Sequence, residues 1–445
     1  GHVRSLPSRT AAVRPEADFE MDFEVTKGSE RVVAALCRAV KAASAVYLAT
    51  DPDREGEAIA WHINELLHQR GALVAGVPVS RVAFSEITET AVRGALARAR
   101  PIDECLVAAQ QARQAIDYLF GFTLSPLLWR KLPGCRSAGR VQSVALRLLV
   151  EREEERARFV VQEYWSLGLS LAGSSGGSAA EEEAGRPVLS ACLTELSGKR
   201  LAKFDIGSAA SAGEAALSLR DAPGWRVDAI KRSSRVHNPK PPYNTASLQQ
   251  HASSQLSLSV SEVMYHAQKL YEGLPVDGEP RGLITYMRTD SLEMSDEAIE
   301  SARGYATARF GADHVSEEAR RYRGRNARSA QEAHEAIRPV DFSLEPEMLE
   351  SIVPPAELAL YTLIWRRALA SQMASSEHEL LAITLRTEDG TAAARASASR
   401  VVFAGFETVV RPAREEVEAT TSAVEDDEAA KDAAVAAVAG DGADD

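Results

Sequence analysis

The first hundred residues alternate between helical and strand-like spacing of apolar positions. Within residues 29–43, Val33, Leu36 and Val40 recur at the three- to four-residue spacing of an amphipathic helix. Because strands that alternate with helices usually pair in parallel, this pattern predicts an α/β sheet over residues 1–100. The predicted elements are a helix at 29–43, a strand at 45–50, a helix at 57–70, a strand at 79–84 and a helix at 88–98.

Beyond Pro101 the pattern changes several times, which predicts a multidomain chain of α/β plus α+β class. A strand is expected at Leu283–Tyr286 inside a mostly helical stretch, and a helix at 356–373. Residues 173–188 form a low-complexity segment inside a predicted hairpin. The expected parts are an α/β domain at 1–100, a helical region at 101–162, a β-rich arm at 163–238 and 346–412, a helical domain at 239–345, and a disordered acidic tail at 413–445.

The charge of the chain is unevenly distributed. The 445 residues suit roughly two to four domains, and the formal net charge is -13. From Arg414 onward there are eleven acidic residues and two basic ones, so the tail holds most of the excess. Basic residues gather at 130–147 and 231–240. Because local potential decides whether a phosphate backbone binds, the net charge does not exclude nucleic acid.

Other features of the composition narrow the class. No run of about 18 apolar residues is present, so no membrane-spanning helix is expected. The four cysteines lack a C-x-x-C pair, which argues against a zinc ribbon and a disulfide scaffold and favours a reducing compartment. The first residues lack the apolar core of a secretory signal.

An acidic turn follows the first predicted strand and opens a helix. Asp51, Asp53 and Glu55 alternate with other residues, and carboxylates in that spacing can converge on Mg²⁺. Gly56 permits a sharp turn, and the helix N-terminus favours anions. The simpler interpretation, a surface capping loop, has about equal weight. An EF-hand is disfavoured because a strand precedes the turn and its twelfth position is His62.

A tyrosine lies where the short strand at 283–286 is predicted to end. A hydroxyl in that position can project into a cleft, and a phenolate can attack phosphorus to give a covalent phosphotyrosine. Arg288, two residues beyond Tyr286, would point to the same side and can stabilise charge on the phosphoryl oxygens. For an arbitrary Tyr-x-Arg sequence, a core tyrosine beside a surface arginine is the commoner interpretation.

Several segments together resemble one family. LATDPDREGEAIAWHI at 48–63 is similar to the D-x-D-x-E-G motif of a Toprim domain, and ITYMRTDS at 284–291 resembles the active-site motif of type IA DNA topoisomerases. Y-M-R-T-D-S is more similar to the bacterial-type topoisomerase I than to topoisomerase III. Toprim domains also occur in primases and nucleases, so the acidic turn alone leaves the class open. Further matching blocks are SAGRVQS at 137–143, the segment 241–250, the segment 267–273 and QEAHEAIRP at 331–339.

The resemblance implies a fold and roles for individual residues. It implies a Toprim domain joined to a toroidal type IA topoisomerase core. Tyr286 would be the nucleophile, Arg288 and His334 would stabilise the phosphate under attack, and Mg²⁺ would be the cofactor. The implied metal ligands are Asp51, Asp53 and Glu55, and the implied DNA contacts are Arg113, Ser137, Arg140, Gln142, Thr289 and Asp290.

The sequence departs from the family at its ends and at two internal positions. The opening GHVRSLP resembles a segment downstream of the family's first Toprim strand, whose glutamate would protonate the leaving 3′ oxygen. The family's later G-I-G-R-P-S-T-Y block and zinc-binding repeats do not follow Phe406. We therefore expect a chain incomplete at both ends, with a partial Toprim domain. Ser85 and Gln114 replace residues more usual in the family.

The expected function is transient cleavage of one DNA strand through a 5′-phosphotyrosine, strand passage and religation, which relaxes negative supercoils without ATP. The partner would be a single-stranded segment of negatively supercoiled duplex. The protein would be a monomer, and it would not associate with a membrane. The compartment would be a chloroplast or mitochondrion in a plant or alga, and otherwise the bacterial cytoplasm. A catalytically inactive DNA-binding fragment is the alternative, and a Toprim nuclease or primase is a third candidate that would not use the Tyr286 block.

Overall fold

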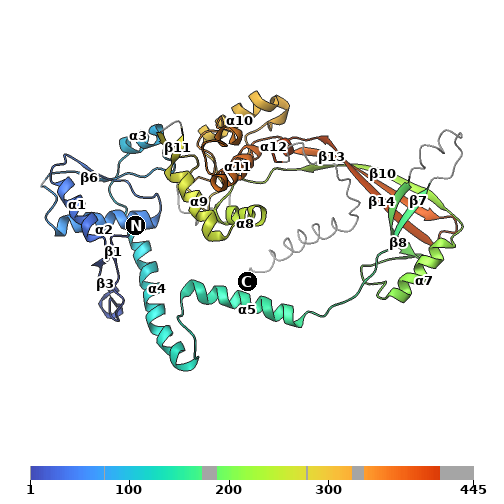
Figure 1. The fold of residues 1–445 in the computed structure, drawn as a ribbon, viewed down its shortest axis with the longest axis horizontal. Coiled ribbons are helices and arrows are strands. Elements are labelled where there is room, and N and C mark those ends of the chain that lie inside the picture. The colour runs from blue at the N-terminus through green and yellow to red at the C-terminus, as the bar shows by residue number, and fades with distance from the viewer. Residues whose placement is uncertain (1, 75, 173–187, 277–278, 323–334, 411–445) are drawn as a thin grey trace, which may run out of the picture. The chain divides into compact units, whose positions relative to one another are not determined.

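The computed structural model describes residues 2–74, 76–172, 188–276, 279–322 and 335–410 (Figure 1). These residues fall into two compact units. Of the described residues, those within 2–158, 240–309 and 318–372 form the first unit, and those within 159–239, 310–317 and 373–410 form the second. Most of the low-complexity segment and the acidic tail lie outside the described residues.

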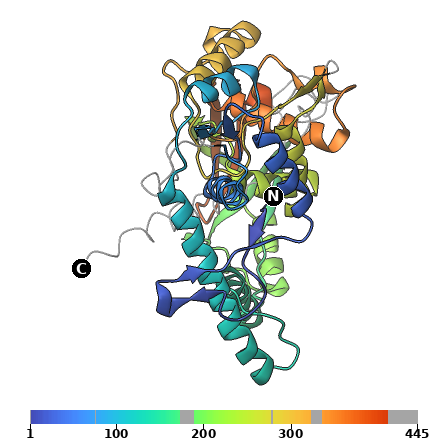
Figure 2. The ribbon, with the colours of Figure 1, turned by 90° about the vertical axis from the view of Figure 1, so that its left-hand side faces the viewer.

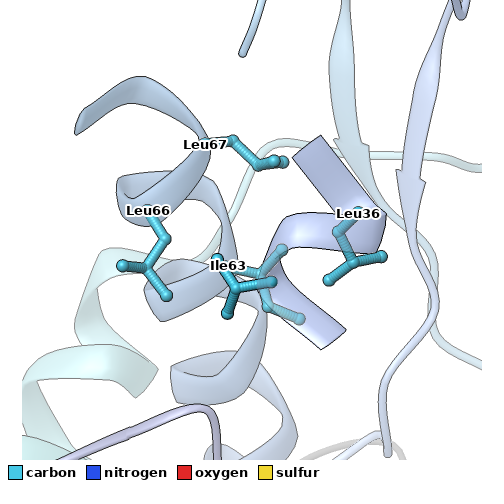
Figure 3. A pocket seen from close by; sticks show the side chains of 5 residues that line it. Leu36, Ile63, Leu66 and Leu67 are labelled. Atoms are coloured by element: carbon cyan, nitrogen blue, oxygen red, sulfur yellow. The ribbon is translucent and has the colours of Figure 1, made fainter. Parts of the chain in front are cut away.

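The N-terminal part of the first unit is the expected α/β layer. Strand β5 (Val46–Leu48) pairs in parallel with β6 (Val79–Arg81). Helix α1 (Glu30–Val40) packs on α2 (Arg54–Gln69) through aliphatic side chains that line a small apolar pocket (Figure 3). Burial of such side chains stabilises the pair of helices. The pocket is lined by Val33, Leu36, Ile63, Leu66 and Leu67.

Helix α2 begins at Arg54 rather than at the predicted residue 57, because Asp53 caps it. The side chain of Asp53 accepts a hydrogen bond from the N–H of Gly56. A capping carboxylate satisfies one of the donors that every helix N-terminus leaves unpaired. The acidic turn and the start of the helix are therefore one structure.

The predicted helical region after residue 101 consists of two long helices, α4 (Glu104–Lys131) and α5 (Arg140–Arg158), preceded by α3 (Glu89–Ala97). Figure 2 shows the small hairpin of β2 (Val13–Arg14) and β3 (Glu20–Met21) beside α4. Trp129, near the end of α4, does not pack in a core. Its ring is 58% exposed, and its indole N–H donates to the carbonyl of Arg136.

The rest of the first unit is a helical cluster. Within it, α9 and α11 pack directly on each other. The helices are α8 (Thr245–Leu256), α9 (Val260–Glu272), α10 (Asp296–Phe310, whose last residue belongs to the second unit) and α11 (Pro355–Ala370).

The strand predicted at Leu283–Tyr286 does not form. This stretch makes a single bridge, between Ile284 and Pro339. Three of its backbone N–H groups donate to carbonyls in three different segments, those of Leu270, Arg338 and Ser85. The sequence pattern was apolar because the segment is buried, and burial alone does not require a strand.

The second unit is built around an antiparallel sheet with the order β10–β13–β14–β8–β7, and β9 (Lys199–Arg200) pairs with β8. Its core contains Ala191, Leu385 and Ala394. A helix, α7 (Ala209–Arg220), lies within the range 163–238 that was predicted as part of a β-rich arm, and a Ser208 capping box starts it. The strands are β7 (Gly168–Ala172), β8 (Val188–Leu196), β10 (Trp225–His237), β13 (Ser376–Thr387) and β14 (Ala392–Phe403).

Short elements complete the described chain. They are the pair β1 (Arg4–Ser5) and β4 (Glu24–Val25), the pair β11 (Leu274–Val276) and β12 (Glu279–Arg281), the helix α12 (Glu407–Val410), and the 3-10 turns η1 (Pro15–Ala17), η2 (Ala312–His314) and η3 (Pro346–Leu349).

Candidate active site

The acidic turn is held tightly against the start of α2. The hydroxyl of Thr50 donates to the carbonyl of Gly56 at 2.5 Å, and the N–H of Gly56 donates to Oδ1 of Asp53 at 2.8 Å. A Cβ on Gly56 would lie 2.0 Å from the carbonyl oxygen of Asp51. Glycine is therefore required here by the close approach of two backbone segments rather than by its own dihedral angles.

A cluster of charged residues, formed by Glu57, Arg81 and Arg100, contacts the backbone of the turn. The carboxylate of Glu57, 1% exposed, accepts from Nε of the fully buried Arg81 at 2.9 Å and from Nη1 of Arg100 at 2.8 Å. Arg81 also donates to the backbone carbonyls of Leu48 and Asp51. A buried ion pair whose donors and acceptors all have partners holds the surrounding backbone in one conformation, even where its net contribution to the free energy of folding is small.

Sequence reasoning missed this cluster. A signal for it was present, because Arg81 is a lone charge within the apolar run V-S-R-V-A-F. Charged side chains are rarely buried unless they are paired, so a charge within a strand points to a partner in the core.

Tyr286 is buried in the same unit and reaches the acidic turn. Its hydroxyl donates a hydrogen bond of 2.8 Å to Oδ2 of Asp53, and its backbone N–H donates to the carbonyl of Ser85. The ring is 2% exposed and meets the ring of Tyr271 edge to face, with the centroids 5.3 Å apart. The nucleophile and the acid proposed from two distant sequence motifs are therefore in direct contact.

The surroundings of the phenol keep it protonated. Burial raises the pKa of Tyr286, and the charge of Asp53 together with its hydrogen bond raises it further, while Arg288 opposes the shift. Burial also raises the pKa of the Asp51 carboxyl, and the neighbouring Asp53 adds to that effect. Two carboxylates that repel each other in a partly buried turn form a site where a cation is favoured.

The residues after Tyr286 divide into exposed and buried positions. Arg288 and Asp290 are exposed, whereas Thr289 is buried and its N–H donates to the hydroxyl of Thr245 at 2.8 Å. The hydroxyl of Thr289 accepts from the N–H of Ser291. Thr289 thus shapes the loop that presents Arg288 and Asp290 to solvent.

The three acids of the turn do not converge as the spacing predicted. Across the described ranges, three ligand atoms of His, Cys, Asp or Glu approach within 4.8 Å at one place, and it is not this turn. Glu55 lies on α2 and accepts instead from the side-chain amide of Gln110 at 3.1 Å. Asp51 and Asp53 supply the hard oxygen donors that suit Mg²⁺.

The predicted DNA contacts near the start of α5 form a local polar network. Arg140 pairs with Asp117, with Nε 2.9 Å from Oδ1, and the side-chain amide of Gln142 donates to the hydroxyl of Ser137 at 3.2 Å. Arg113 is exposed on α4. Arg140 therefore has a carboxylate partner that a phosphate would have to replace.

Two other predicted segments have different outcomes. His334 lies outside the described residues. In the segment 241–250, Asn244 and Ser247 form the capping box of α8. These side chains satisfy backbone groups of the helix, which accounts for their polarity.

Comparison with known proteins decides the family. Residues 101–440 match the DNA topoisomerase family, and residues 1–87 match the Toprim domain. The chain belongs to the DNA topoisomerase family. It is 42% identical over 411 residues to DNA topoisomerase 1 of Rickettsia bellii, covering 92% of this chain and 50% of the relative. With DNA topoisomerase 1 of Zymomonas mobilis it shares 42% identity over 409 residues, covering 92% and 31%.

A solved structure is similar throughout most of the chain. Full-length topoisomerase I from Thermotoga maritima matches with a TM-score of 0.74 and 36% identity, covering 94% of this chain and 64% of that chain. The chain spans about half the length of the Rickettsia topoisomerase. These comparisons confirm the predicted family and the predicted fold class, a multidomain α/β protein with a Toprim domain.

Two predictions from composition can also be compared with the structure. No helix among the described residues is long and apolar enough to span a membrane. Cys37, Cys105, Cys135 and Cys192 are all free in the structure.

Proposed function

We propose that this topoisomerase chain cleaves one strand of DNA through Tyr286, holds the 5′ end as a phosphotyrosine ester, and reseals the break after strand passage. Negative supercoils are relaxed without ATP because the ester keeps the energy of the phosphodiester bond. The observation that carries the proposal is the hydrogen bond between the Tyr286 hydroxyl and Asp53. It joins the tyrosine motif to the acidic turn of the Toprim domain across 233 positions of sequence.

In this proposal Asp53 is the proton acceptor for the phenol. The pKa of Tyr286 is raised, so the hydroxyl is neutral at physiological pH and must lose its proton as its oxygen bonds to phosphorus. The Asp53 carboxylate is already 2.8 Å from that oxygen. General bases act from this distance. The 3′ oxygen of the cleaved strand is the leaving group and departs as a 3′ hydroxyl by taking a proton from water. The attack of this hydroxyl on the phosphotyrosine, in the reverse direction, reseals the strand.

Arg288 stabilises the phosphate during both steps. It is exposed, lies two residues from the nucleophile, and is close enough for its charge to lower the pKa of both Tyr286 and Asp51. A guanidinium in that position offsets the negative charge that develops on the phosphoryl oxygens. His334 and Asp290 are further candidates for contact with the same strand.

Asp51 and Asp53 fit Mg²⁺, with Glu55 as a third ligand after rearrangement. Bound there, the ion would supply positive charge for a nearby phosphate. The exposed Arg113 and the Ser137, Arg140 and Gln142 network would contact the DNA backbone. Arg140 exchanges Asp117 for phosphate in this proposal.

A second candidate function is binding of DNA without cleavage. The phenol is 2% exposed and hydrogen-bonded to a carboxylate, so DNA cannot reach it in this conformation. Cleavage requires the Tyr286 segment and the acidic turn to separate far enough to admit a phosphate. A chain that could not make this movement would bind single strands and leave them intact.

Relaxation of negatively supercoiled plasmid with Mg²⁺ and without ATP distinguishes the two functions. The proposal predicts a ladder of topoisomers that are less negatively supercoiled than the starting plasmid. Retardation of a single-stranded oligonucleotide without any change in plasmid linking number would support the binding function instead. Net degradation of the plasmid would indicate a nuclease and contradict both.

A further inference from the structure

A cluster of two histidines and one glutamate lies in the second unit, outside the candidate active site. One ring nitrogen each of His237 and His378 and a carboxylate oxygen of Glu407 all lie within 4.8 Å of one another. Nε2 of His378 is 3.0 Å from Oε1 of Glu407, and Nδ1 of His237 is 3.7 Å from the same oxygen. Across the described ranges, this is the one place where three such ligand atoms come together.

The backbone brings the three residues together from distant parts of the sequence. His237 ends β10 and pairs with Ser376 at the start of β13. Because strand side chains alternate, His378 lies on the same face as Ser376 and diagonally opposite His237. The imidazole rings of His237 and His378 have centroids 4.5 Å apart.

The turn before α12 places Glu407 over these strands. The N–H of Phe406 donates to the carbonyl of Ala374 at 2.9 Å. Gly405 has φ +49°, and a Cβ there would lie 2.5 Å from the carbonyl oxygen of Ser375. The backbone of the turn is therefore pressed against the start of β13, and Glu407 follows as the first residue of the helix.

The geometry points to a Zn²⁺ site. We propose that His237, His378 and Glu407 bind one zinc ion. Zinc prefers imidazole nitrogen and carboxylate oxygen at about 2.0–2.2 Å, which places tetrahedral ligand atoms about 3.3 Å apart. The two separations of 3.0 and 3.7 Å fall on either side of that value. Mg²⁺ is disfavoured here because it prefers oxygen ligands.

Neighbouring groups complete the surroundings of the ion. The hydroxyl of the buried Ser376 donates to Oε1 of Glu407 at 2.7 Å and lies 3.2 Å from Nε2 of His378. A partner of this kind orients a ligand carboxylate. The side chains of His378 and Glu407 are 12% and 13% exposed, whereas His237 is 40% exposed. A fourth position therefore remains accessible to water on the His237 side.

The ion would connect the end of β10 and the start of β13 to the first residue of α12. These strand ends lie close in sequence to the first unit, since one segment of the second unit ends at residue 239 and another begins at residue 373. A bound metal therefore stabilises the second unit where the chain enters and leaves it. Metal that binds only the folded state raises its stability by mass action.

The test uses the chain after treatment with a chelator. Calorimetry measures the binding of Zn²⁺, and visible absorption measures the binding of Co²⁺ in place of Zn²⁺. The wild-type chain is expected to bind one ion at this site, with a Co²⁺ spectrum of low coordination number and a raised melting temperature. His237→Ala and His378→Ala should each weaken binding at least tenfold. His68→Ala, at an exposed histidine of α2, and Asp53→Asn, in the acidic turn, should retain it.

His237 is partly exposed, so its replacement removes a ligand without opening the core. Equal Zn²⁺ affinity in the wild-type chain and both histidine variants would overturn the proposal, as would the absence of saturable binding at micromolar Zn²⁺. Binding abolished only by Asp53→Asn would also overturn it, because the ion would then occupy the acidic turn.

Discussion

The hydroxyl of Tyr286 donates a 2.8 Å hydrogen bond to the carboxylate of Asp53, the residue that caps helix α2. Oδ1 of Asp53 accepts from the N–H of Gly56 in the first turn of the helix, and Oδ2 accepts from the phenol. The bond stabilises the protonated tyrosine and excludes a phosphate from the same position. In the proposed function a phosphate must therefore be admitted beside the phenol before Asp53 accepts its proton, and the arrangement leads to the following predictions.

Arg288→Ala is expected to slow DNA cleavage by about 10²–10³-fold, because it removes positive charge from the phosphate under attack. The side chain is exposed, so the melting temperature should stay unchanged. Single-turnover cleavage of a labelled oligonucleotide measures the effect. Arg288→Lys is the matched control and should recover part of the rate, since it restores charge without the planar fork. Wild-type cleavage by Arg288→Ala would rule out the role.

Gly56→Ala is expected to destabilise the first unit by more than about 3 kcal/mol, since the added Cβ meets the carbonyl oxygen of Asp51 at 2.0 Å. Urea unfolding measures the change. Gly94→Ala on α3 is the matched control, because its nearest contact is a flexible arginine side chain at 3.7 Å. That variant should gain about 0.5–1 kcal/mol through helix propensity. Similar stability of the two variants would contradict the described turn.

Glu57→Gln is expected to cost about 3–5 kcal/mol, because it leaves Arg81 buried without a countercharge. Glu89→Gln, which removes an exposed ion pair with Arg93, should cost no more than about 0.5 kcal/mol. Thermal unfolding of the two variants side by side gives the comparison. An equal loss in both would show that the buried cluster does not support the turn.

The same cluster predicts a pH dependence. Burial pushes the pKa of the Glu57 carboxyl upward, but the hydrogen bonds from Arg100 and Asp103 and the charge of Arg81 outweigh it and bring the pKa below its usual value. A lowered folded-state pKa contributes stability that is present above pH 4.5 and is lost as the pH falls through the folded pKa. The difference in stability between wild type and Glu57→Gln should shrink below pH 4.5. A difference independent of pH would contradict this.

Asp51→Asn is expected to raise the melting temperature of the metal-free chain near neutral pH. Burial and the charge of Asp53 raise the pKa of Asp51, so its ionised form disfavours the folded state there. The variant should also lose the stabilisation that Mg²⁺ gives the wild-type chain. Scanning calorimetry with and without Mg²⁺ tests both effects. A lower melting temperature in the absence of Mg²⁺ would count against the assigned repulsion between the two acids.

The sequence allowed the family, the fold class and the main elements to be predicted, because periodicity and short motifs are local properties. The helix at 29–43 and the strand at 45–50 correspond to α1 and β5. What failed depended on tertiary context. Leu283–Tyr286 is apolar because it is buried, yet its N–H groups bond to three different segments and no strand forms.

The site was predictable in part for the same reason. The motifs identified Tyr286 and Asp53, but nothing local shows that their side chains touch. The convergence of Asp51, Asp53 and Glu55 was inferred from spacing, whereas Glu55 falls within α2 and turns toward Gln110. Arg81 was overlooked because its partner Glu57 lies 24 residues away.

The most direct test of the central claim is covalent trapping of DNA. A single-stranded oligonucleotide labelled on the 3′ side of the cleavage position is mixed with the protein and stopped with denaturant, and the label attached to protein is measured. The wild-type chain and Tyr271→Phe, which alters the neighbouring buried phenol, should both retain label, and Tyr286→Phe should retain none. Label on Tyr286→Phe, or its loss from Tyr271→Phe alone, would contradict the assignment of Tyr286 as the nucleophile.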